Sequence, residues 1–406
     1  MKGLSKNVWV LTVGLSLMLS CSSLVVFLGG IIGTELAPSG ELSTLPVASI
    51  IVGTALFTIP VALLMKKLGR RATFLLMFTI SIGFSLLGAY SIYVSSFYLF
   101  CFSLLLMGMS IATLNQFRFA AMESVKVDLI PLAASTVLLG GIAAAYIGPE
   151  VALAGRTLLS VEYVGSFLLL SGLFALGLVT VSFYRNTQQS EENKKESGRS
   201  LSTIVRQPVF LAAVASAAVG YAIMSFIMTA TPVSMHVMDG HSLEDTKWVI
   251  QSHILAMFLP SLVSGYFIKK IGNVKMIFIG IVAFVVCKAI AYSGHQVAHY
   301  WWSLLLLGVG WNFLFIGGTT LLPFSYETNE RFKVQAVNDF IIFGTQAISA
   351  LSAGFIVHAL GWETLLLISI PFLVIPVVAV IYFSMDRSKS QTTDESQEIE
   401  SVESES

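Results

Sequence analysis

The sequence predicts an all-α polytopic membrane protein, with twelve transmembrane helices in two six-helix halves. The first observation is composition: of 406 residues, 55% are hydrophobic and 11% are charged, and the mean hydropathy is +0.83. That is more apolar surface than one soluble core buries, so a lipid bilayer is the expected surrounding. The second is length: apolar runs of about 20 residues, enough to cross a bilayer core, recur from Val8 to Phe383. The third is an internal repeat.

Polar residues, Gly and Pro divide the apolar runs into candidate helices. The first run continues past Cys21 to Ile32, which is too long for the apolar region of a signal peptide, the alternative interpretation. The expected helices are 8–32, 44–65, 72–93, 97–120, 131–153, 163–184, 208–236, 247–268, 276–294, 300–324, 337–358 and 363–384.

A polar segment separates the sixth and seventh helices. Residues 185–207 are rich in Ser, Gln, Glu and Lys, which predicts a solvated linker. The chain is therefore expected to consist of an N-terminal half (1–184), this linker, a C-terminal half (208–384) and a disordered acidic tail (385–406).

The repeat relates the two halves. The sequence LMKKLG at 64–69 is echoed by FIKKIG at 267–272, an offset of 203 residues, and LLLMG at 104–108 by LLLLG at 304–308, an offset of 200. Repeated halves are a transporter architecture whose substrate site lies between them, near the membrane midplane.

Basic residues predict the orientation. With the N-terminus inside, 20 of the 23 Lys and Arg residues fall on the cytoplasmic side, and Arg156, Lys247 and Lys288 are the exceptions. Both termini and the linker are expected in the cytoplasm, and the protein in the inner membrane.

Other functional classes find no support in the sequence. A net charge of zero argues against nucleic-acid binding, and neither a phosphate-binding loop nor an HExxH motif is present. No enzyme activity, catalytic residue, metal site or cofactor is predicted. The expected partners are a small-molecule substrate and protons, and the expected state is a monomer.

The loop between the second and third helices resembles that of the major facilitator superfamily. The family pattern there is Gly, three residues, Asp, a basic residue, any residue, Gly, Arg, then Arg or Lys. The corresponding residues are Ala62, Lys66, Lys67, Leu68, Gly69, Arg70 and Arg71. The Gly-Arg-Arg end is present, whereas the first Gly and the Asp are replaced.

Two helices resemble family motifs in part. Gly140, Gly148 and Pro149 match the Gly-rich stretch of family antiporters, although Ala152 replaces one of its last glycines. Leu104 occupies the place of a membrane arginine that proton-coupled multidrug antiporters carry, which weighs against that function.

Three stretches, 115–121, 228–232 and 335–340, resemble a broad set of bacterial members of the superfamily. Some bacterial riboflavin importers lie near this set, although no binding residue matches one by one. The resemblance covers about residues 8–384 and implies alternating access.

The resemblance also implies that the first, fourth, seventh and tenth helices line the substrate path, and the eighth adds two polar positions. Aromatic and Met side chains beside a few amides suit a flat or amphipathic organic solute. The candidate substrate-binding residues are Asn115, Gln116, Tyr221, Met224, Gln251, His253, Trp311, Asn312 and Phe315.

Charged residues near the membrane are candidates for gating and coupling. Asp339 is expected to lie at the N-terminus of its helix, where the helix dipole favours a carboxylate. The alternative is that it pairs with Arg70 or Arg71 across the cytoplasmic side. Arg118, three residues after Asn115, is expected on the same helix face, lining the inner cavity or reaching the interface.

Glu150 follows Pro149 in a predicted kink in the outer half of the membrane. Burial there would favour its neutral form and suit a proton-coupling role, and the alternative is that Glu150 reaches the interface or a polar neighbour. The function predicted overall is secondary active transport of a small organic solute, either as vitamin or metabolite import or as efflux. A membrane receptor or scaffold is the alternative outside transport.

Overall fold

The structure is a computed structural model that describes residues 4–122, 124–126, 130–186, 199–327 and 330–387. Throughout these ranges the chain folds into helices and forms no β-strand. Nine helical stretches of the described chain are long and apolar enough to cross a bilayer. The predicted all-α membrane fold is confirmed, while the count of twelve spans stays a prediction.

Thirteen α-helices are labelled in chain order. Two of them contain a glycine with non-helical backbone angles, Gly272 in α11 and Gly361 in α13. A further helix covers residues 374–387. The labelled helices are α1 (Lys6–Leu36), α2 (Leu45–Leu68), α3 (Arg70–Tyr93), α4 (Phe97–Leu114), α5 (Phe117–Met122), α6 (Ile130–Arg156), α7 (Val164–Ser182), α8 (Leu201–Val205), α9 (Pro208–Pro232), α10 (Leu243–Phe258), α11 (Ser261–Tyr292), α12 (Val297–Leu321) and α13 (Arg331–Ile368). The shorter turns are η1 (Gly40–Leu42), η3 (Val233–Met238), η4 (Leu322–Ser325) and η5 (Pro371–Leu373).

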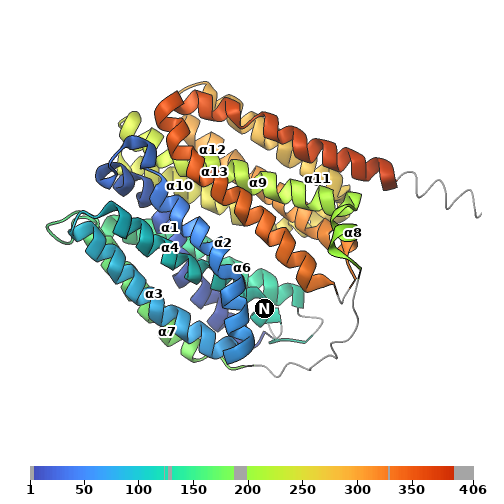
Figure 1. Cartoon of the computed structure of the whole chain (residues 1–406), viewed down its shortest axis with the longest axis horizontal. Helices are drawn as coiled ribbons and strands as arrows, with labels where there is room; N and C mark the ends of the chain where they lie inside the picture. Colours follow the sequence, from blue (N-terminus) through green and yellow to red (C-terminus); the bar gives the residue numbers. More distant parts are fainter. Residues whose placement is uncertain (1–3, 123, 127–129, 187–198, 328–329, 388–406) are drawn as a thin grey trace, which may run out of the picture.

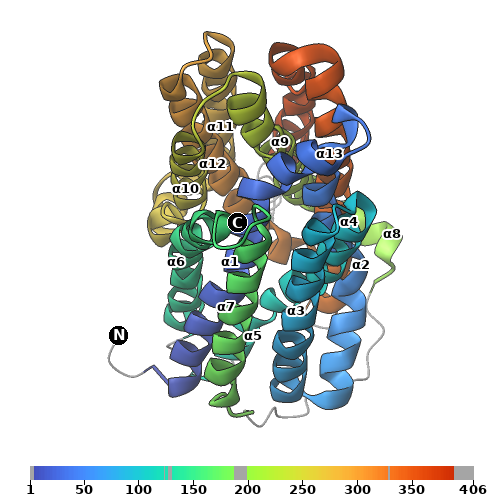
Figure 2. The ribbon, with the colours of Figure 1, turned by 90° about the vertical axis from the view of Figure 1, so that its left-hand side faces the viewer.

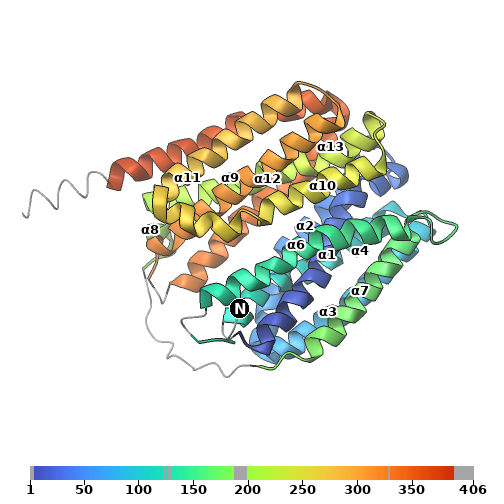
Figure 3. The same cartoon turned by 180° about the vertical axis from the view of Figure 1, so that it is seen from behind.

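The helices form two groups that lie side by side (Figure 1). Seen from behind, α1 to α7 form one layer and α9 to α13 the other, and the quarter-turn view separates the same two groups (Figures 2 and 3). Between the groups, α2 packs against α13, α6 against α10, and α1 against α9. A substrate path between two repeated halves would run along these three contacts.

Both groups contain the same close helix contact. A Cβ atom on Gly108 of α4 would overlap the backbone of Gly53 in α2, and one on Gly308 of α12 would lie 2.6 Å from the carbonyl oxygen of His253 in α10. Gly308 lies 200 residues after Gly108, and His253 lies 200 residues after Gly53. The repeat in the sequence therefore corresponds to a repeated packing contact.

The Gly-rich stretch of α6 is a packing surface. Gly140, Ala144, Gly148 and Ala152 recur every fourth residue, so they share one helix face. Cβ atoms on the two glycines would each lie 2.5 Å from a carbonyl oxygen of α1. Small residues at this spacing let two membrane helices approach closely, which explains the match to the antiporter pattern structurally.

At one end of the molecule the two groups touch directly. This end carries residues 36–45, 156–164 and 239–243, and is called here the predicted outer end. A Cβ atom on Gly30 of α1 would lie 3.0 Å from Cγ2 of Val233. A direct approach this close leaves no open path between α1 and η3.

Two predicted helices differ from the observed ones, and in each a proline lies at the point where the regular α-helix ends. The predicted helix 208–236 is α-helical only to Pro232 and continues as a π-helical turn, η3. The predicted helix 247–268 begins earlier, at Leu243, and is interrupted at Pro260, which lacks the backbone N–H that a continuous helix needs.

Helices α10 and α12 are joined by a tryptophan pair. Trp248 stacks on Trp301 with ring centroids 5.0 Å apart and an interplanar angle of 5°. The indole N–H of Trp301 donates to Ser252 Oγ at 2.8 Å. Stacking and hydrogen bond together fix the register of these two helices.

Candidate functional site

An aromatic cluster lies where α9, α10, α12 and α13 meet. It consists of Tyr221, Phe258, Trp311, Phe315 and Phe343. Tyr221 of α9 contacts the rings of Trp311, Phe315 and Phe343 edge-on, with centroids 5.0, 5.2 and 5.8 Å apart. Three predicted substrate-binding residues, Tyr221, Trp311 and Phe315, are thus brought together.

Helix spacing builds the flat face of this cluster. Trp311 and Phe315 are four residues apart on α12, so their rings lie on one helix face and stack at 5.1 Å with an interplanar angle of 13°. Phe258 of α10 contacts Trp311 at 6.3 Å and lies 3.3 Å from the Cβ position of Gly141 in α6. The cluster therefore belongs to one helix group and reaches the other.

Two buried nitrogen atoms of predicted substrate-binding residues, one in the cluster and one elsewhere on α10, have no hydrogen-bond partner among the described residues. Trp311 is 4% exposed, and its Nε1 lacks an acceptor. His253 of α10 is fully buried, and its Nδ1 lies 2.7 Å from the carbonyl oxygen of Leu304, while Nε2 is unpaired. An unpaired buried polar atom is costly, so a bound polar ligand is one way to satisfy it.

Two other predicted substrate-binding residues lie nearby but do not join the cluster. Met224 is buried on α9, one turn from Tyr221. Asn312 donates from Nδ2 to the carbonyl oxygen of Met257 and to Ser261 Oγ, and accepts from Ser264 Oγ. The amide of Asn312 is used to hold the α10–α11 junction, which sequence spacing alone did not reveal.

Gln251 connects the two helix groups. Its Nε2 donates to Glu150 Oε1 at 3.3 Å and lies 3.5 Å from the carbonyl oxygen of Tyr146 in α6. Glu150 also forms an ion pair with Lys247 Nζ at 3.0 Å, and its side chain is 57% exposed. The structure thus gives Glu150 two polar neighbours and leaves its side chain more than half exposed, so the burial expected for a proton-coupling role is not observed.

Asn115 and Arg118, predicted to lie on one helix, are separated by a break in the helix. Helix α4 ends at Leu114, residues 115 and 116 form a turn, and Arg118 belongs to the separate helix α5. The turn instead brings Gln116 to Arg70, whose Nη1 donates to the carbonyl oxygen of Gln116 at 3.2 Å and to its Oε1 at 3.4 Å. Asn115 is half-buried beside this contact.

The expected position of Asp339 at a helix start is wrong. Helix α13 begins at Arg331, so Asp339 lies in its third turn, where the effect of the helix dipole has faded. The helix therefore starts six residues before the predicted boundary at 337. Asp339 Oδ1 accepts from Asn338 Nδ2 at 3.0 Å.

Arg71 binds the end of α7. Its Nη2 donates to the carbonyl oxygen of Ser182 at 2.9 Å, and its backbone N–H donates to Asn186 Oδ1 at 3.0 Å. The latch between Asp339 and Arg70 or Arg71 stays a prediction.

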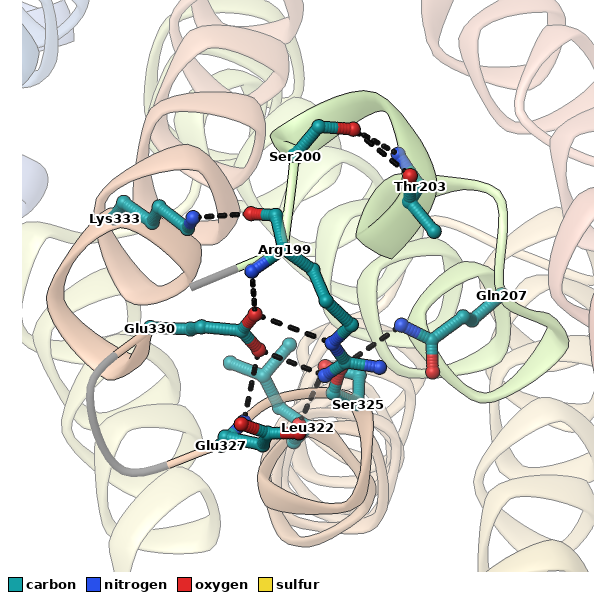
Figure 4. A network of polar contacts seen from close by, with 9 residues as sticks. All are labelled: Arg199, Ser200, Thr203, Gln207, Leu322, Ser325, Glu327, Glu330 and Lys333. Atoms are coloured by element: carbon teal, nitrogen blue, oxygen red, sulfur yellow. Dashed lines mark hydrogen bonds and ion pairs between the residues drawn. The ribbon is translucent and has the colours of Figure 1, made fainter. Parts of the chain in front are cut away.

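A polar network that the sequence did not predict holds the end of the linker (Figure 4). The fully buried carboxylate of Glu330 accepts from the backbone N, Nε and Nη2 of Arg199 at 2.5, 3.1 and 2.7 Å, and from the backbone N of Glu327 at 2.9 Å. Lys333 donates to the carbonyl oxygen of Arg199. The hydrogen bonds from Arg199 hold the pKa of Glu330 at about 2.

The same region carries a second repeated contact. Gln207, just before α9, donates to the carbonyl oxygen of Ser325 at 2.9 Å, and Asn7, near the start of α1, donates to Ser124 Oγ at 3.2 Å. The offsets are 200 residues between Asn7 and Gln207 and 201 between Ser124 and Ser325. Each group thus ties its first helix to the segment that follows its fourth.

At the predicted outer end, His295 lies between two carboxylates. Its Nδ1 is 2.9 Å from Asp239 Oδ2 and its Nε2 is 2.6 Å from Glu363 Oε1. Tyr300 also donates to Asp239, at 2.7 Å. Partial burial alone would lower the pKa of His295, but these two carboxylates raise it overall.

No group of three or more His, Cys, Asp or Glu side chains suited to a metal ion occurs in the part of the chain that the structure describes. The three cysteines, Cys21, Cys101 and Cys287, are buried free thiols.

The chain is similar in sequence to known membrane transporters. The sequence model of the Major Facilitator Superfamily matches residues 10–242 and 235–405. The riboflavin transporter RfnT of Brucella anthropi is 36% identical over 379 residues, which cover 93% of this chain and 94% of that protein. An uncharacterized MFS-type transporter of Bacillus subtilis, YdeG, is 28% identical over 87% of this chain and 86% of its own.

Solved structures show the same fold. A point mutant of the nucleoside transporter NupG matches with a TM-score of 0.71 at 14% identity, over 94% of this chain and 99% of that one. A bacterial homolog of the human lysosomal transporter Spinster, in an inward-facing and unoccupied conformation, matches with a TM-score of 0.67 at 13% identity, over 94% and 97%. Fold, apolar helices and sequence agree, and the chain is a multi-pass membrane transporter that belongs to the Major Facilitator Superfamily.

Proposed function

We propose that the chain is a secondary active transporter that carries riboflavin, or a solute with a similar flat and amphipathic ring system, by alternating access. The observation that carries the proposal is the aromatic cluster, in which Trp311 and Phe315 present stacked rings beside Tyr221. The 36% identity to a riboflavin transporter over nearly the whole chain supports the same substrate.

The chemistry of the cluster suits a ring with a polar edge. Aromatic rings bind a flat π-system by stacking. The unpaired Nε1 of Trp311 is a donor for a carbonyl group of the solute. The unpaired Nε2 of His253 is an acceptor for an N–H group when Nδ1 carries the proton. A flavin ring system offers both kinds of group.

The remaining parts of the proposal follow from the sequence. The N-terminal half (1–184) and the C-terminal half (208–384) move against each other, with the linker (185–207), the acidic tail (385–406) and both termini in the cytoplasm. The protein acts as a monomer in the inner membrane. Asn115, Gln116, Met224, Gln251 and Asn312 complete or support the binding site.

Coupling is assigned to ionisable residues. Glu150 is the proposed coupling residue on the outer side, while Arg70, Arg71, Asp339 and Arg118 act on the cytoplasmic side as gating residues. A proton gradient then drives accumulation of the solute, and reversal of the gradient reverses the net flux.

Flux in proteoliposomes tests the function. Purified protein is reconstituted, and radiolabelled riboflavin is followed into and out of the vesicles with and without a pH gradient. Saturable flux that unlabelled riboflavin competes supports the proposal, and its direction under a gradient distinguishes import from efflux. Binding with no flux in either direction would favour the receptor alternative.

Substitution of Trp311 tests the site. Trp311→Leu removes the stacking surface, and we expect the Kd for riboflavin to rise about tenfold, equivalent to about 1.4 kcal/mol. Trp9→Leu is the matched control, because Trp9 is 42% exposed on α1. Equal affinities of the two variants, both still folded by thermal denaturation, would exclude the cluster as the site.

A further inference from the structure

Helices α6 and α10 form a continuous seam between the two helix groups. Glu150 Oε1 of α6 lies 3.0 Å from Lys247 Nζ of α10, and the carbonyl oxygen of Tyr146 lies 3.5 Å from Gln251 Nε2. A Cβ atom on Gly141 would lie 3.3 Å from the ring of Phe258. These contacts run in one direction along α6 and in the opposite direction along α10. The seam therefore extends from the predicted outer end to the level of the aromatic cluster.

The outer end of the seam is an ion pair. The side chain of Lys247 is only 13% exposed and lies between Glu150, at 3.0 Å, and Glu244 of its own helix, at 2.8 Å. Gln251, one turn further along α10, donates to the same carboxylate oxygen of Glu150. One cation and one amide from α10 thus converge on one carboxylate of α6.

The ion pair also accounts for the position of Lys247, an exception to the bias of basic residues towards the cytoplasmic side. Lys247 is one of two basic residues on the predicted outer side, and a largely buried ammonium group there needs a partner. The other, Arg156, pairs with Glu162 at 3.2 Å inside its own helix group. Of the two, only the Lys247 pair joins the groups.

Neighbouring contacts show that this end is closed in the structure. Gly30 meets Val233, and the position of a Cβ atom on Gly354 of α13 overlaps Thr44 before α2. Gly141 lies deeper along the seam than Glu150 and Lys247. A path for solute from this end therefore requires α6 and α10 to separate more at the ion pair than at Gly141.

We infer that the ion pair of Lys247 with Glu150, supported by Gln251, is a latch that holds this end of the transporter closed and must break each time it opens. Lys247 and Gln251 act as positioning residues for the transport cycle. The inference rests on the alternating access of the proposed function, but not on the identity of the solute.

Distance measurements without any solute test the latch. Spin labels are placed at Leu159 and Met238, which are exposed at the predicted outer end on different helix groups. The three native cysteines are buried, and are kept or replaced by alanine. Lys247→Met and Glu150→Gln are each expected to raise the ratio of open to closed populations about fivefold, equivalent to about 1 kcal/mol for a partly exposed pair.

The charge-reversed double variant Glu150→Lys with Lys247→Glu is expected to restore part of the closed population, because Glu244 lies next to position 247 and repels the carboxylate introduced there. Arg156→Gln is the matched control, because it breaks an ion pair at the same end within one group, and it is expected to leave the distribution unchanged. Unchanged distances in both single variants would overturn the latch, and so would an equal shift in Arg156→Gln.

The experiments distinguish failure of the latch inference from failure of the proposed substrate. If riboflavin neither binds nor moves but the two single variants shift the distance distribution, the latch stands and the solute is a different one. If riboflavin is transported while the variants leave the distribution unchanged, the function stands and the latch is wrong.

Discussion

Gly69 and Gly272 adopt the same backbone conformation, although 203 residues separate them. Their φ and ψ angles are 80° and 164° at Gly69, and 81° and 161° at Gly272. Each follows a Lys-Lys pair and lies where one membrane helix ends and the next begins. The positive φ explains why glycine is present at both positions of the repeated loop.

We predict that Gly69→Ala and Gly272→Ala each lower the free energy of unfolding by about 1–2 kcal/mol, because an alanine at positive φ is strained. Steric overlap is not the cause, since the Cβ position at Gly272 has no neighbour within 4 Å and that at Gly69 has one at 3.5 Å. Thermal denaturation in detergent measures the change. Gly83→Ala, at an open position within α3, is the control and is expected to be neutral or stabilising.

The Arg199–Glu330 pair predicts sensitivity to acid. Hydrogen bonds from Arg199 lower the pKa of Glu330 from 4.5 to about 2. A carboxylate with a lowered pKa stabilises the folded state above its unfolded value, and this contribution is lost as the pH falls from about 4.5 towards 2. Wild-type protein is therefore expected to lose more thermal stability over this range than Glu330→Gln.

Glu41→Gln, at an exposed carboxylate of η1, is the control for that experiment. It is expected to retain the acid sensitivity of the wild type. Identical pH profiles for Glu330→Gln and wild type would contradict the prediction.

His295 predicts sensitivity in the opposite direction. Its pKa lies above the ordinary value of 6.5, because Asp239 and Glu363 outweigh the effect of partial burial. The stabilisation from its charged form is complete below about 6.5 and is lost as the pH rises through the raised pKa. Melting temperatures between pH 6 and 9 are expected to fall more steeply in wild type than in His295→Gln, and parallel slopes would refute this.

Lys288 offers a test of a buried charge. Its side chain is 3% exposed in α11, and Nζ donates to the carbonyl oxygen of Ser369 at 3.0 Å. Lys288→Met keeps the volume and removes the buried charge, so we expect a change in unfolding free energy within about 1 kcal/mol or a gain. Lys288→Ala is expected to cost about 2–4 kcal/mol, because it leaves a cavity. Similar losses in both variants would show that the charge itself stabilises the fold.

Apolar length and the repeat were enough to predict the membrane fold, because bilayer thickness imposes a run of residues on every span. The exact ends of the helices depend on features that apolar length does not report. Helix α13 extends eight residues beyond Asp339 towards its N-terminus through charged residues, and Pro232 is followed by a π-helical turn. Local backbone geometry and packing decide these ends.

The site was predicted less completely than the fold. Tyr221, Trp311 and Phe315 meet because helix periodicity places aromatic residues on facing sides of α9 and α12. Asn312 illustrates the limit, since its amide binds atoms of the α10–α11 junction that spacing cannot place. Pairs across the chain, such as Arg199 with Glu330, depend on how segments more than 100 residues apart meet.

The sequence contained one signal for ion pairs: two basic residues on the predicted outer side. Arg156 and Lys247 are exceptions to the bias of basic residues towards the cytoplasmic side, and in the structure both have carboxylate partners. A basic residue on the outer side of a membrane protein is thus a reason to search for an acidic neighbour before a structure is known.

The stacked indoles of Trp248 and Trp301 give the protein an optical marker of its own. Two indole chromophores with centroids 5.0 Å apart couple their excited states, and the strength of this coupling depends on their distance and relative orientation. Because one indole belongs to α10 and the other to α12, sliding of these helices past each other would change the contribution of the pair to the ultraviolet circular dichroism spectrum. Movement within this half of the transporter can therefore be followed in the unlabelled wild-type chain.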